Sequence, residues 1–279
     1  MKNIISAPEL HELLQNEKLI ILDASQPGNK AGLVASNPDL QIKGARTFDI
    51  KNDFSDTSSS LPNMLQDEQN FEKAVQALGI NQDSILVAYD NLGIFTSPRA
   101  WWMFKTMGYN NISVLNGGLD AWIDKGFPTE AIGTSQVFDK GNFKASFNKN
   151  AVVDAKYVYE NVNKSTDQVI DARGKQRFDG TVEEPRPGMR SGHIPNSQNL
   201  PFKKLLENGF YKSIEKRKEI FDQLNLDQEK PLIFSCGSGI TAVVDLLGAE
   251  DILPQEKKVY DGSWTEWGQS KYPIATNKD

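Results

Sequence analysis

The chain carries the stretch Pro-Leu-Ile-Phe-Ser-Cys-Gly-Ser-Gly-Ile-Thr-Ala from Pro231 to Ala242. Its apolar start predicts a buried β-strand, and the run from Ile240 to Leu247 predicts a helix. Between them lie Cys236 and the two glycines Gly237 and Gly239. A strand, a tight loop and the start of a helix together can form a binding site for an anion. The backbone N–H groups of the loop turn inward, and the helix dipole adds positive potential. The stretch therefore predicts an α/β fold with Cys236 in an anion-binding loop.

Cys236 is the only cysteine of the chain. The positive potential of such a loop favours the thiolate, which is the nucleophilic form of the side chain. A lone cysteine is more often a buried structural residue, but a packed strand gains nothing from flanking glycines. A phosphatase loop of the pattern Cys-x5-Arg would also follow a strand, yet Ala242 stands where its arginine belongs. We therefore interpret Cys236 as a reactive thiolate, and the loop argues against phosphatase chemistry.

The overall composition is that of an ordinary globular protein. The chain has 279 residues, 38% hydrophobic and 24% charged, a length that suits two domains. A formal net charge of -6 argues against non-specific nucleic-acid binding. One cysteine suits a reducing compartment, and two histidines argue against a protein metal site. We see no signal peptide and no membrane-spanning run, so we expect a cytoplasmic protein without membrane association.

The two halves of the chain repeat one plan. Four pairs of matching blocks lie 145 to 148 residues apart: Leu22–Ser25 with Ile170–Arg173, Gly44 with Gly192, Leu86–Asp90 with Leu232–Cys236, and Leu115–Trp122 with Tyr260–Trp267. So constant an offset indicates tandem domains. Strands that alternate with helices predict, in each domain, a mainly parallel sheet flanked by helices. We predict domains at 1–130 and 151–279, joined by a polar linker at 131–150.

Local patterns give the elements of the first half. Strand-length apolar runs lie at 19–22, 84–89 and 112–115, and helical spacing covers 67–78 and 98–107. Residues 26–44 are polar and punctuated by glycine and proline, which predicts a long connection. The tryptophans have helical or turn spacing and are expected in the core: Trp101, Trp102, Trp122, Trp264 and Trp267.

The loop Cys-Gly-Ser-Gly-Ile-Thr from Cys236 to Thr241 resembles the active-site loop of the 3-mercaptopyruvate sulfurtransferases, a branch of the rhodanese family. The resemblance covers nearly the whole chain and implies two rhodanese-like domains. It implies that Cys236 accepts a sulfur atom, holds it as a persulfide and passes it to a thiol or to cyanide, without a cofactor. The first-domain counterpart of Cys236 is Asp90, which cannot carry a persulfide. We therefore expect the first domain to be a structural partner.

A second segment, Arg177 to Arg186, is similar to the family's Arg-Phe-x-Gly-Thr…Pro-Arg stretch. On that resemblance both arginines bind the substrate carboxylate and carbonyl, a task that suits planar guanidinium groups. The resemblance implies Cys236 and Ser238 as catalytic residues. The substrate-binding residues that we expect are Arg177, Arg186, Gly237, Gly239, Ile240 and Thr241. The nearby Arg173 and Arg190 rank lower, and the Gly-His-Ile-Pro motif at His193 is expected to be a structural turn.

The resemblance also implies the reaction. The Cys236 thiolate would attack the sulfur of 3-mercaptopyruvate, pyruvate enolate would leave, and a small thiol or a thioredoxin-like protein would take the sulfur. Relatives that prefer thiosulfate carry Arg and Lys where this chain has Gly237 and Ser238. Proton transfer by Ser238 stays open, because Gln41 stands where many relatives have a histidine. A thiosulfate:cyanide sulfurtransferase and a persulfide carrier without turnover remain alternatives.

Overall fold

The structure is a computed structural model that describes residues 1–29, 31–133 and 137–277. Its contacts divide the chain into two compact units. The first unit comprises Met1–Thr57, Leu65–Asn148 and Asn208–Tyr211, and the second comprises Ser58–Met64, Lys149–Glu207 and Lys212–Asp279. Of the predicted linker 131–150, residues 137–148 count with the first unit, where Phe143 is buried, and residues 134–136 lie outside the described part.

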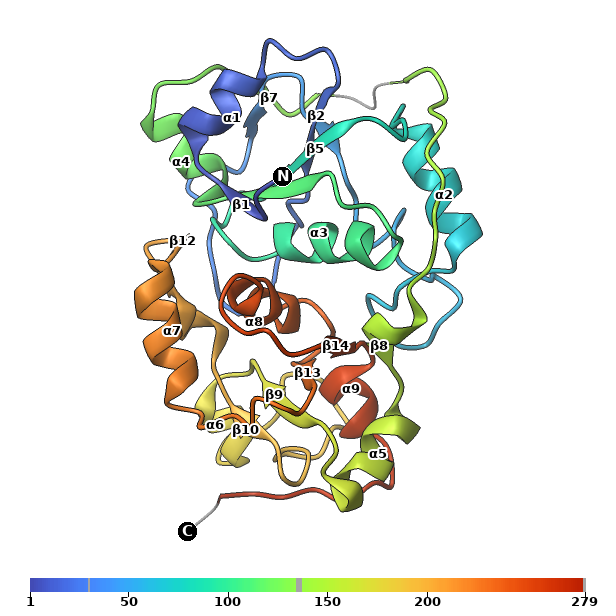
Figure 1. The fold of residues 1–279 in the computed structure, drawn as a ribbon, viewed down its shortest axis with the longest axis vertical. Coiled ribbons are helices and arrows are strands. Elements are labelled where there is room, and N and C mark those ends of the chain that lie inside the picture. The colour runs from blue at the N-terminus through green and yellow to red at the C-terminus, as the bar shows by residue number, and fades with distance from the viewer. Residues whose placement is uncertain (30, 134–136, 278–279) are drawn as a thin grey trace. The chain divides into compact units, whose positions relative to one another are not determined.

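The first unit is built on a five-stranded parallel sheet (Figure 1). Its strand order is β1 (Ile4–Ile5), β6 (Ile112–Leu115), β5 (Ile85–Tyr89), β2 (Leu19–Asp23) and β4 (Arg46–Thr47). The helices are α1 (Ala7–Leu13), α2 (Glu68–Ala77), α3 (Ser97–Thr106) and α4 (Gly118–Asp124). The long connection also contains β3 (Leu40–Ile42), which pairs antiparallel with β7 (Thr129–Ala131). Three residues are too few for a clear strand pattern, so the sequence did not indicate β3.

The second unit repeats the sheet. Its strand order is β10 (Gln198–Asn199), β9 (Gln168–Asp171), β13 (Leu232–Ser235), β14 (Lys257–Tyr260) and β8 (Val152–Val153), all parallel. The helices are α5 (Ala155–Lys164), α6 (Lys175–Asp179), α7 (Ile214–Asp222), α8 (Ala242–Ala249) and α9 (Ser263–Trp267). Shorter elements are the 3-10 turns at Lys149–Ala151 and Phe202–Leu205, and the strands β11 (Leu206–Glu207) and β12 (Phe210–Tyr211), the last counted with the first unit. Equivalent strands occupy equivalent places in the two sheets, which confirms the predicted tandem α/β folds.

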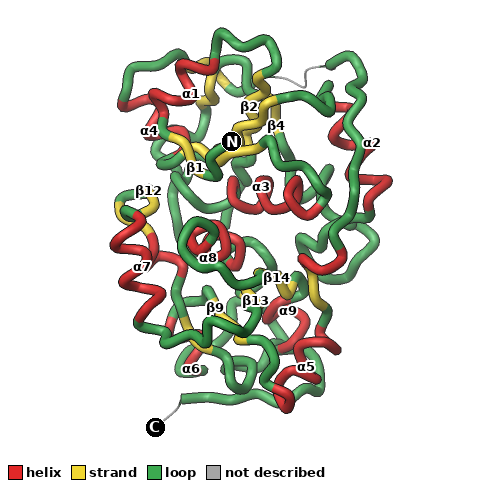
Figure 2. The backbone as a smooth tube through the Cα atoms, in the orientation of Figure 1, coloured by secondary structure: helices red, strands yellow, loops and turns green. Residues whose placement is uncertain are grey.

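The strands are short and long loops connect the elements (Figure 2). All four residues of β13 are buried, as expected for the central strand of a parallel sheet covered on both faces. Parallel strands end at a common edge, so β9, β13 and β14 bring the residues that follow them to one edge of the sheet. The five tryptophans are buried in the cores, as predicted.

Within the described ranges, every helix is too short or too polar to span a lipid bilayer.

Candidate active site

Cys236 directly follows β13, and only 2% of it is exposed. The loop after it turns at Gly239, whose φ of +77° lies in the left-handed region that favours glycine. Residues 240 and 241 are half-buried and lead into α8. The start of α9 holds the loop, because Trp264 N–H donates to the Cys236 carbonyl at 2.9 Å and the Thr265 hydroxyl donates to the Gly237 carbonyl at 2.6 Å. The cysteine is thus fixed between two helix starts.

Ser263 is a neighbour of Cys236 that the sequence analysis missed. Its Oγ accepts a hydrogen bond from Cys236 N–H at 3.2 Å and lies 3.9 Å from Sγ. Its φ is +50°, a left-handed conformation that is strained for serine, and the equivalent residue of the first unit is Gly118, with φ +56°. The sequence did contain a signal for Ser263, because the first half of the chain has a glycine, Gly118, at the equivalent position.

The first-unit counterpart of this loop already holds an anion. One carboxylate oxygen of Asp90 accepts N–H groups of Phe95, Thr96 and Ser97 at 3.0, 2.9 and 2.8 Å, together with the Ser97 hydroxyl at 2.7 Å. The other oxygen accepts Leu92 N–H at 3.0 Å. Burial raises the pKa of Asp90, and these hydrogen bonds oppose the shift. The loop conformation of this fold therefore gathers N–H donors around one negative group.

Arg177 lies against the loop that follows Cys236. A Cβ placed on Gly237 would be 3.3 Å from Nη2 of Arg177. The guanidinium binds the buried carboxylate of Glu184 through Nε, at 3.1 and 3.2 Å, and through Nη2. Among the described residues, Nη1 of Arg177 has no hydrogen-bond partner, so one edge of the guanidinium can bind another group.

Arg186 is a half-buried cation, and it makes no ion pair with any residue that the structure describes. Burial lowers the pKa of its guanidinium and the Arg177 cation adds to that shift, whereas Cys236 and Glu184 oppose it. Arg186 is therefore within electrostatic reach of both Cys236 and Arg177. Since Glu184 already forms an ion pair with Arg177, the positive charge of Arg186 can attract another anion.

Arg173 and Arg190 have structural roles. Arg173 is buried, binds Asp171 in two-point fashion and Glu184 at 2.9 Å, and stacks over the Trp264 ring at 4.1 Å. Arg190 donates to the carbonyls of Gly268, Trp267, Ser270 and Tyr272. Glu184, which the sequence analysis did not single out, thus joins the buried Arg173 to the loop-facing Arg177.

His193 also has a structural place. Its Nδ1 lies 2.8 Å from the Phe178 carbonyl, and its ring stacks on the Phe178 ring with centroids 3.8 Å apart. Its backbone pairs with Ala275. These contacts match the turn expected for the Gly-His-Ile-Pro motif.

Ser238 has a partner from a distant part of the sequence. The amide nitrogen of Asn63 donates to the Ser238 carbonyl at 3.0 Å and to its Oγ at 3.2 Å. Asn63 belongs to the segment Ser58–Met64, which counts with the second unit. Gln41 instead donates to the Ala45 carbonyl and to Glu130 within the first unit. The residue that meets the loop serine is therefore an asparagine, 175 positions earlier in the chain.

Asp245 is a buried carboxyl on α8. It is fully buried, and neither of its oxygens has a hydrogen-bond partner among the described residues. Burial raises the pKa of this carboxyl well above its usual range, and the negative charges of Cys236 and Asp171 add to the shift. The folded protein therefore keeps Asp245 protonated at pH values where the unfolded chain has lost the proton.

The buried carboxyl of Asp245 should make the stability of the protein depend on pH. Because the folded form binds the extra proton, the free energy of unfolding should fall as pH rises above about 4, the ordinary pKa of aspartate, by up to about 1.4 kcal/mol per pH unit. Asp245→Asn removes the titration and keeps the shape. We expect it to be more stable than wild type by about 1–3 kcal/mol at pH 7 and equally stable near pH 4, measured by urea unfolding. The exposed Asp222→Asn is the control, and a difference that does not change with pH would contradict the prediction.

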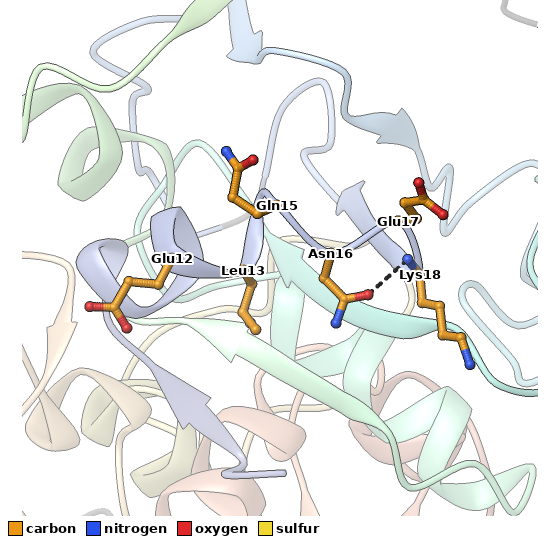
Figure 3. Close-up of a pocket in the computed structure, with 6 residues that line it drawn as sticks. All are labelled: Glu12, Leu13, Gln15, Asn16, Glu17 and Lys18. Carbon is orange, nitrogen blue, oxygen red and sulfur yellow. Dashed lines mark hydrogen bonds between the residues drawn. The ribbon is translucent and has the colours of Figure 1, made fainter.

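A surface pocket lies at the end of α1, and its residues are distant in sequence from those described above (Figure 3). Its six labelled side chains come from α1 and the turn before β2, and they point in different directions. The dashed line marks the hydrogen bond that Lys18 N–H donates to Asn16 Oδ1 at 3.0 Å. The pocket has no converging polar groups and contains no predicted site residue.

Within residues 1–29, 31–133 and 137–277, no cluster of three His, Cys, Asp or Glu side chains could hold a metal ion.

Comparisons with known proteins agree over both units. The family model described as a rhodanese-like domain matches residues 6–125 and 154–270. The 3-mercaptopyruvate sulfurtransferase of Escherichia coli K12 is 40% identical over 267 residues, which cover 95% of this chain and 94% of that protein. A thiosulfate sulfurtransferase of Cricetulus griseus is 38% identical, over 89% of this chain and 84% of that protein.

Solved structures give the same picture. The crystal structure of SseA from Escherichia coli, described as a 3-mercaptopyruvate sulfotransferase, matches with a TM-score of 0.81 and 36% identity, over 95% of this chain and 99% of that one. The crystal structure of Tum1 from Saccharomyces cerevisiae matches with a TM-score of 0.86 and 30% identity, over 99% of both chains.

Proposed function

The chain belongs to the rhodanese family and is a sulfur-transferring enzyme, and from this premise we propose that it moves sulfur from 3-mercaptopyruvate through a persulfide on Cys236 to a thiol or to cyanide, with release of pyruvate. The observation that carries the choice of donor is the position of positive charge. The residues beside the cysteine, Gly237 and Ser238, are uncharged, whereas the cations come from Arg177 and Arg186, which belong to a separate segment. Mercaptopyruvate carries its charge on a carboxylate away from the reacting sulfur, which fits this arrangement.

In the first half-reaction, the Cys236 thiolate attacks the thiol sulfur of the donor. A sulfur–sulfur bond forms, the carbon–sulfur bond breaks, and its electron pair leaves as the enolate of pyruvate. The enolate gains a proton at carbon, and the transferred sulfur loses its proton to give the persulfide anion, so the protons balance. Arg177 and Arg186 hold the carboxylate and the developing negative charge. In the second half-reaction, an acceptor thiolate takes the outer sulfur and Cys236 leaves as the thiolate.

The backbone of the loop is proposed to hold the persulfide anion. Asp90 supports this, because a carboxylate arm and a persulfide both extend two atoms beyond Cβ and end in negative charge. The second-unit loop is one residue shorter, with α8 starting at Ala242. The N–H groups of Gly237, Gly239, Ile240 and Thr241 then surround the outer sulfur, and the Ser238 hydroxyl donates a hydrogen bond to the reacting substrate.

Further parts of the proposal concern the chain as a whole. Residues 151–279 form the catalytic domain and 1–130 a domain without the cysteine, with a linker at 131–150. The acceptor is a small thiol or a thioredoxin-like protein, and the enzyme works in the cytoplasm without a cofactor. The single free cysteine supports a reducing location.

Steady-state pyruvate release tests the function. We expect many turnovers with 3-mercaptopyruvate and a small thiol, and a kcat/KM well above the value with thiosulfate and cyanide. A higher kcat/KM with thiosulfate would indicate the thiosulfate:cyanide sulfurtransferase. Release of one pyruvate per protein and no more would indicate a persulfide carrier.

Donor choice should follow charge beside the cysteine. Gly237→Arg with Ser238→Lys should raise activity with thiosulfate relative to mercaptopyruvate by about ten- to a hundred-fold, because two cations then face the compact dianion. The new side chain also displaces Arg177, since a Cβ at 237 would already lie 3.3 Å from its guanidinium. The matched control is Asn91→Arg with Leu92→Lys, at the same positions of the first-unit loop. A folded double variant with the wild-type donor ratio would defeat this explanation.

A further inference from the structure

Asn63 contacts Ser238 of the loop that follows Cys236. Asn63 lies in Ser58–Met64, a segment of the first half of the chain that packs with the second unit. Its φ is +60°, in the left-handed region that asparagine tolerates better than most residues. Residues in such unusual backbone conformations often lie at functional sites, and Asn63 contacts a serine of the loop that follows Cys236.

The direction of the two hydrogen bonds follows from their acceptors. The Ser238 carbonyl can only accept, so the amide nitrogen of Asn63, and not its oxygen, must face it at 3.0 Å. The same nitrogen lies 3.2 Å from Ser238 Oγ and donates its second proton there. Turning the amide over would bring its oxygen against the carbonyl oxygen. The backbone of the serine thereby fixes which group its side chain meets.

We infer that Asn63 is a positioning residue that makes Ser238 a hydrogen-bond donor toward the substrate. A hydroxyl that accepts from Asn63 keeps its own proton for another partner. Among the described residues, nothing accepts a hydrogen bond from the Ser238 hydroxyl. A base at position 63 would do the opposite and draw the proton away from the substrate. An amide does not titrate in the accessible pH range, so the arrangement persists at every working pH.

The inference rests on the proposed function, because the acceptor is the reacting donor molecule. The charged groups around the loop are Cys236, Arg177, Arg186 and the buried Glu184, which already pairs with Arg177. With two cations for the carboxylate and one thiolate for the sulfur, the enolate oxygen is the group that still needs a neutral donor. The Ser238 hydroxyl is this donor, and its hydrogen bond from Asn63 leaves the hydroxyl proton directed to the enolate oxygen.

The first test replaces the amide by a carboxylate. Asn63→Asp keeps the shape but has no N–H, so it accepts the Ser238 proton. We expect kcat/KM with 3-mercaptopyruvate at pH 7.5 to fall about ten- to a hundred-fold. The ratio of variant to wild type should recover as pH falls toward 4, the ordinary pKa of aspartate, because a protonated carboxyl again has an O–H to donate. A loss that is the same at pH 4 and pH 7.5, or no loss, overturns the inference.

The second test asks whether Asn63 acts through Ser238. Asn63→Ala should lower kcat/KM by about three- to ten-fold in the wild-type background and by less than about twofold when Ser238 is already alanine. Equal losses in both backgrounds overturn the inference.

The matched control is Asn196→Asp. Asn196 is also left-handed, with φ +66°, and its amide donates to the Val162 carbonyl at 2.9 Å in the same unit. It should keep wild-type activity at both pH values. Wild-type pyruvate release and persulfide formation separate the two proposals. If wild type lacks them, the proposed function fails, whereas wild-type activity with unresponsive Asn63 variants defeats only this inference.

Discussion

Cys236→Ser is expected to lower turnover of 3-mercaptopyruvate by roughly a thousandfold or more. The step needs a polarisable thiolate that can both attack sulfur and later leave from it, and a serine hydroxyl is neither ionised nor a good leaving group at neutral pH. The chain has no second thiol to replace it. The assay is pyruvate release at saturating donor and thiol.

The same variant should remain folded. Serine is nearly the size of cysteine. The hydrogen bond that Trp264 N–H donates to the carbonyl of residue 236, and the one that the N–H of residue 236 donates to Ser263 Oγ, do not use the sulfur. Circular dichroism and the thermal unfolding midpoint are expected to match wild type. Turnover within tenfold of wild type in a folded Cys236→Ser protein would show that the thiolate is not the sulfur carrier.

Loss of the Arg186 cation is expected to have the next largest effect. Arg186→Ala should lower kcat/KM with 3-mercaptopyruvate by about ten- to a hundred-fold, which corresponds to about 1.5–3 kcal/mol for a charge-assisted contact. Arg186 is the cleaner choice, because Arg177→Ala would also leave the buried Glu184 with one cation fewer. Arg186→Lys should recover part of the activity, since it restores the charge without the two-point geometry.

Lys175→Ala is the matched control for this prediction. It removes one cation from the same segment, but the lysine is exposed and pairs with Asp179. It should keep wild-type kinetics. If Arg186→Ala and Arg177→Ala both keep wild-type kcat/KM, the family's carboxylate clamp does not apply to this chain.

Much of the fold could be predicted because its signals are local. The buried run of β13 and the helical spacing of α2 and α3 each lie within one short window, and the repeat offset then linked the two halves. The antiparallel pair β3 and β7 was missed, because each has three residues and its partner lies far away.

The candidate site divides in the same way. Cys236, Arg177 and Arg186 carry motifs that can be read in sequence, and the structure brings them into electrostatic reach of one another. Asn63 has no such signal, since it sits in a polar loop 175 residues before its partner. Gln41 stands where many relatives have a histidine, and its amide donates to Glu130. Long-range contacts made by polar loops depend on how the chain folds back, which composition and spacing do not encode.

The intact mass of the protein after brief exposure to 3-mercaptopyruvate, without acceptor, tests the central claim most directly. The account predicts a gain of one sulfur, about 32 Da, accompanied by one pyruvate per chain, lost on addition of cyanide or thiol and absent from Cys236→Ser. A wild-type protein that releases pyruvate without gaining this mass, or a Cys236→Ser protein that still gains it, would contradict the account.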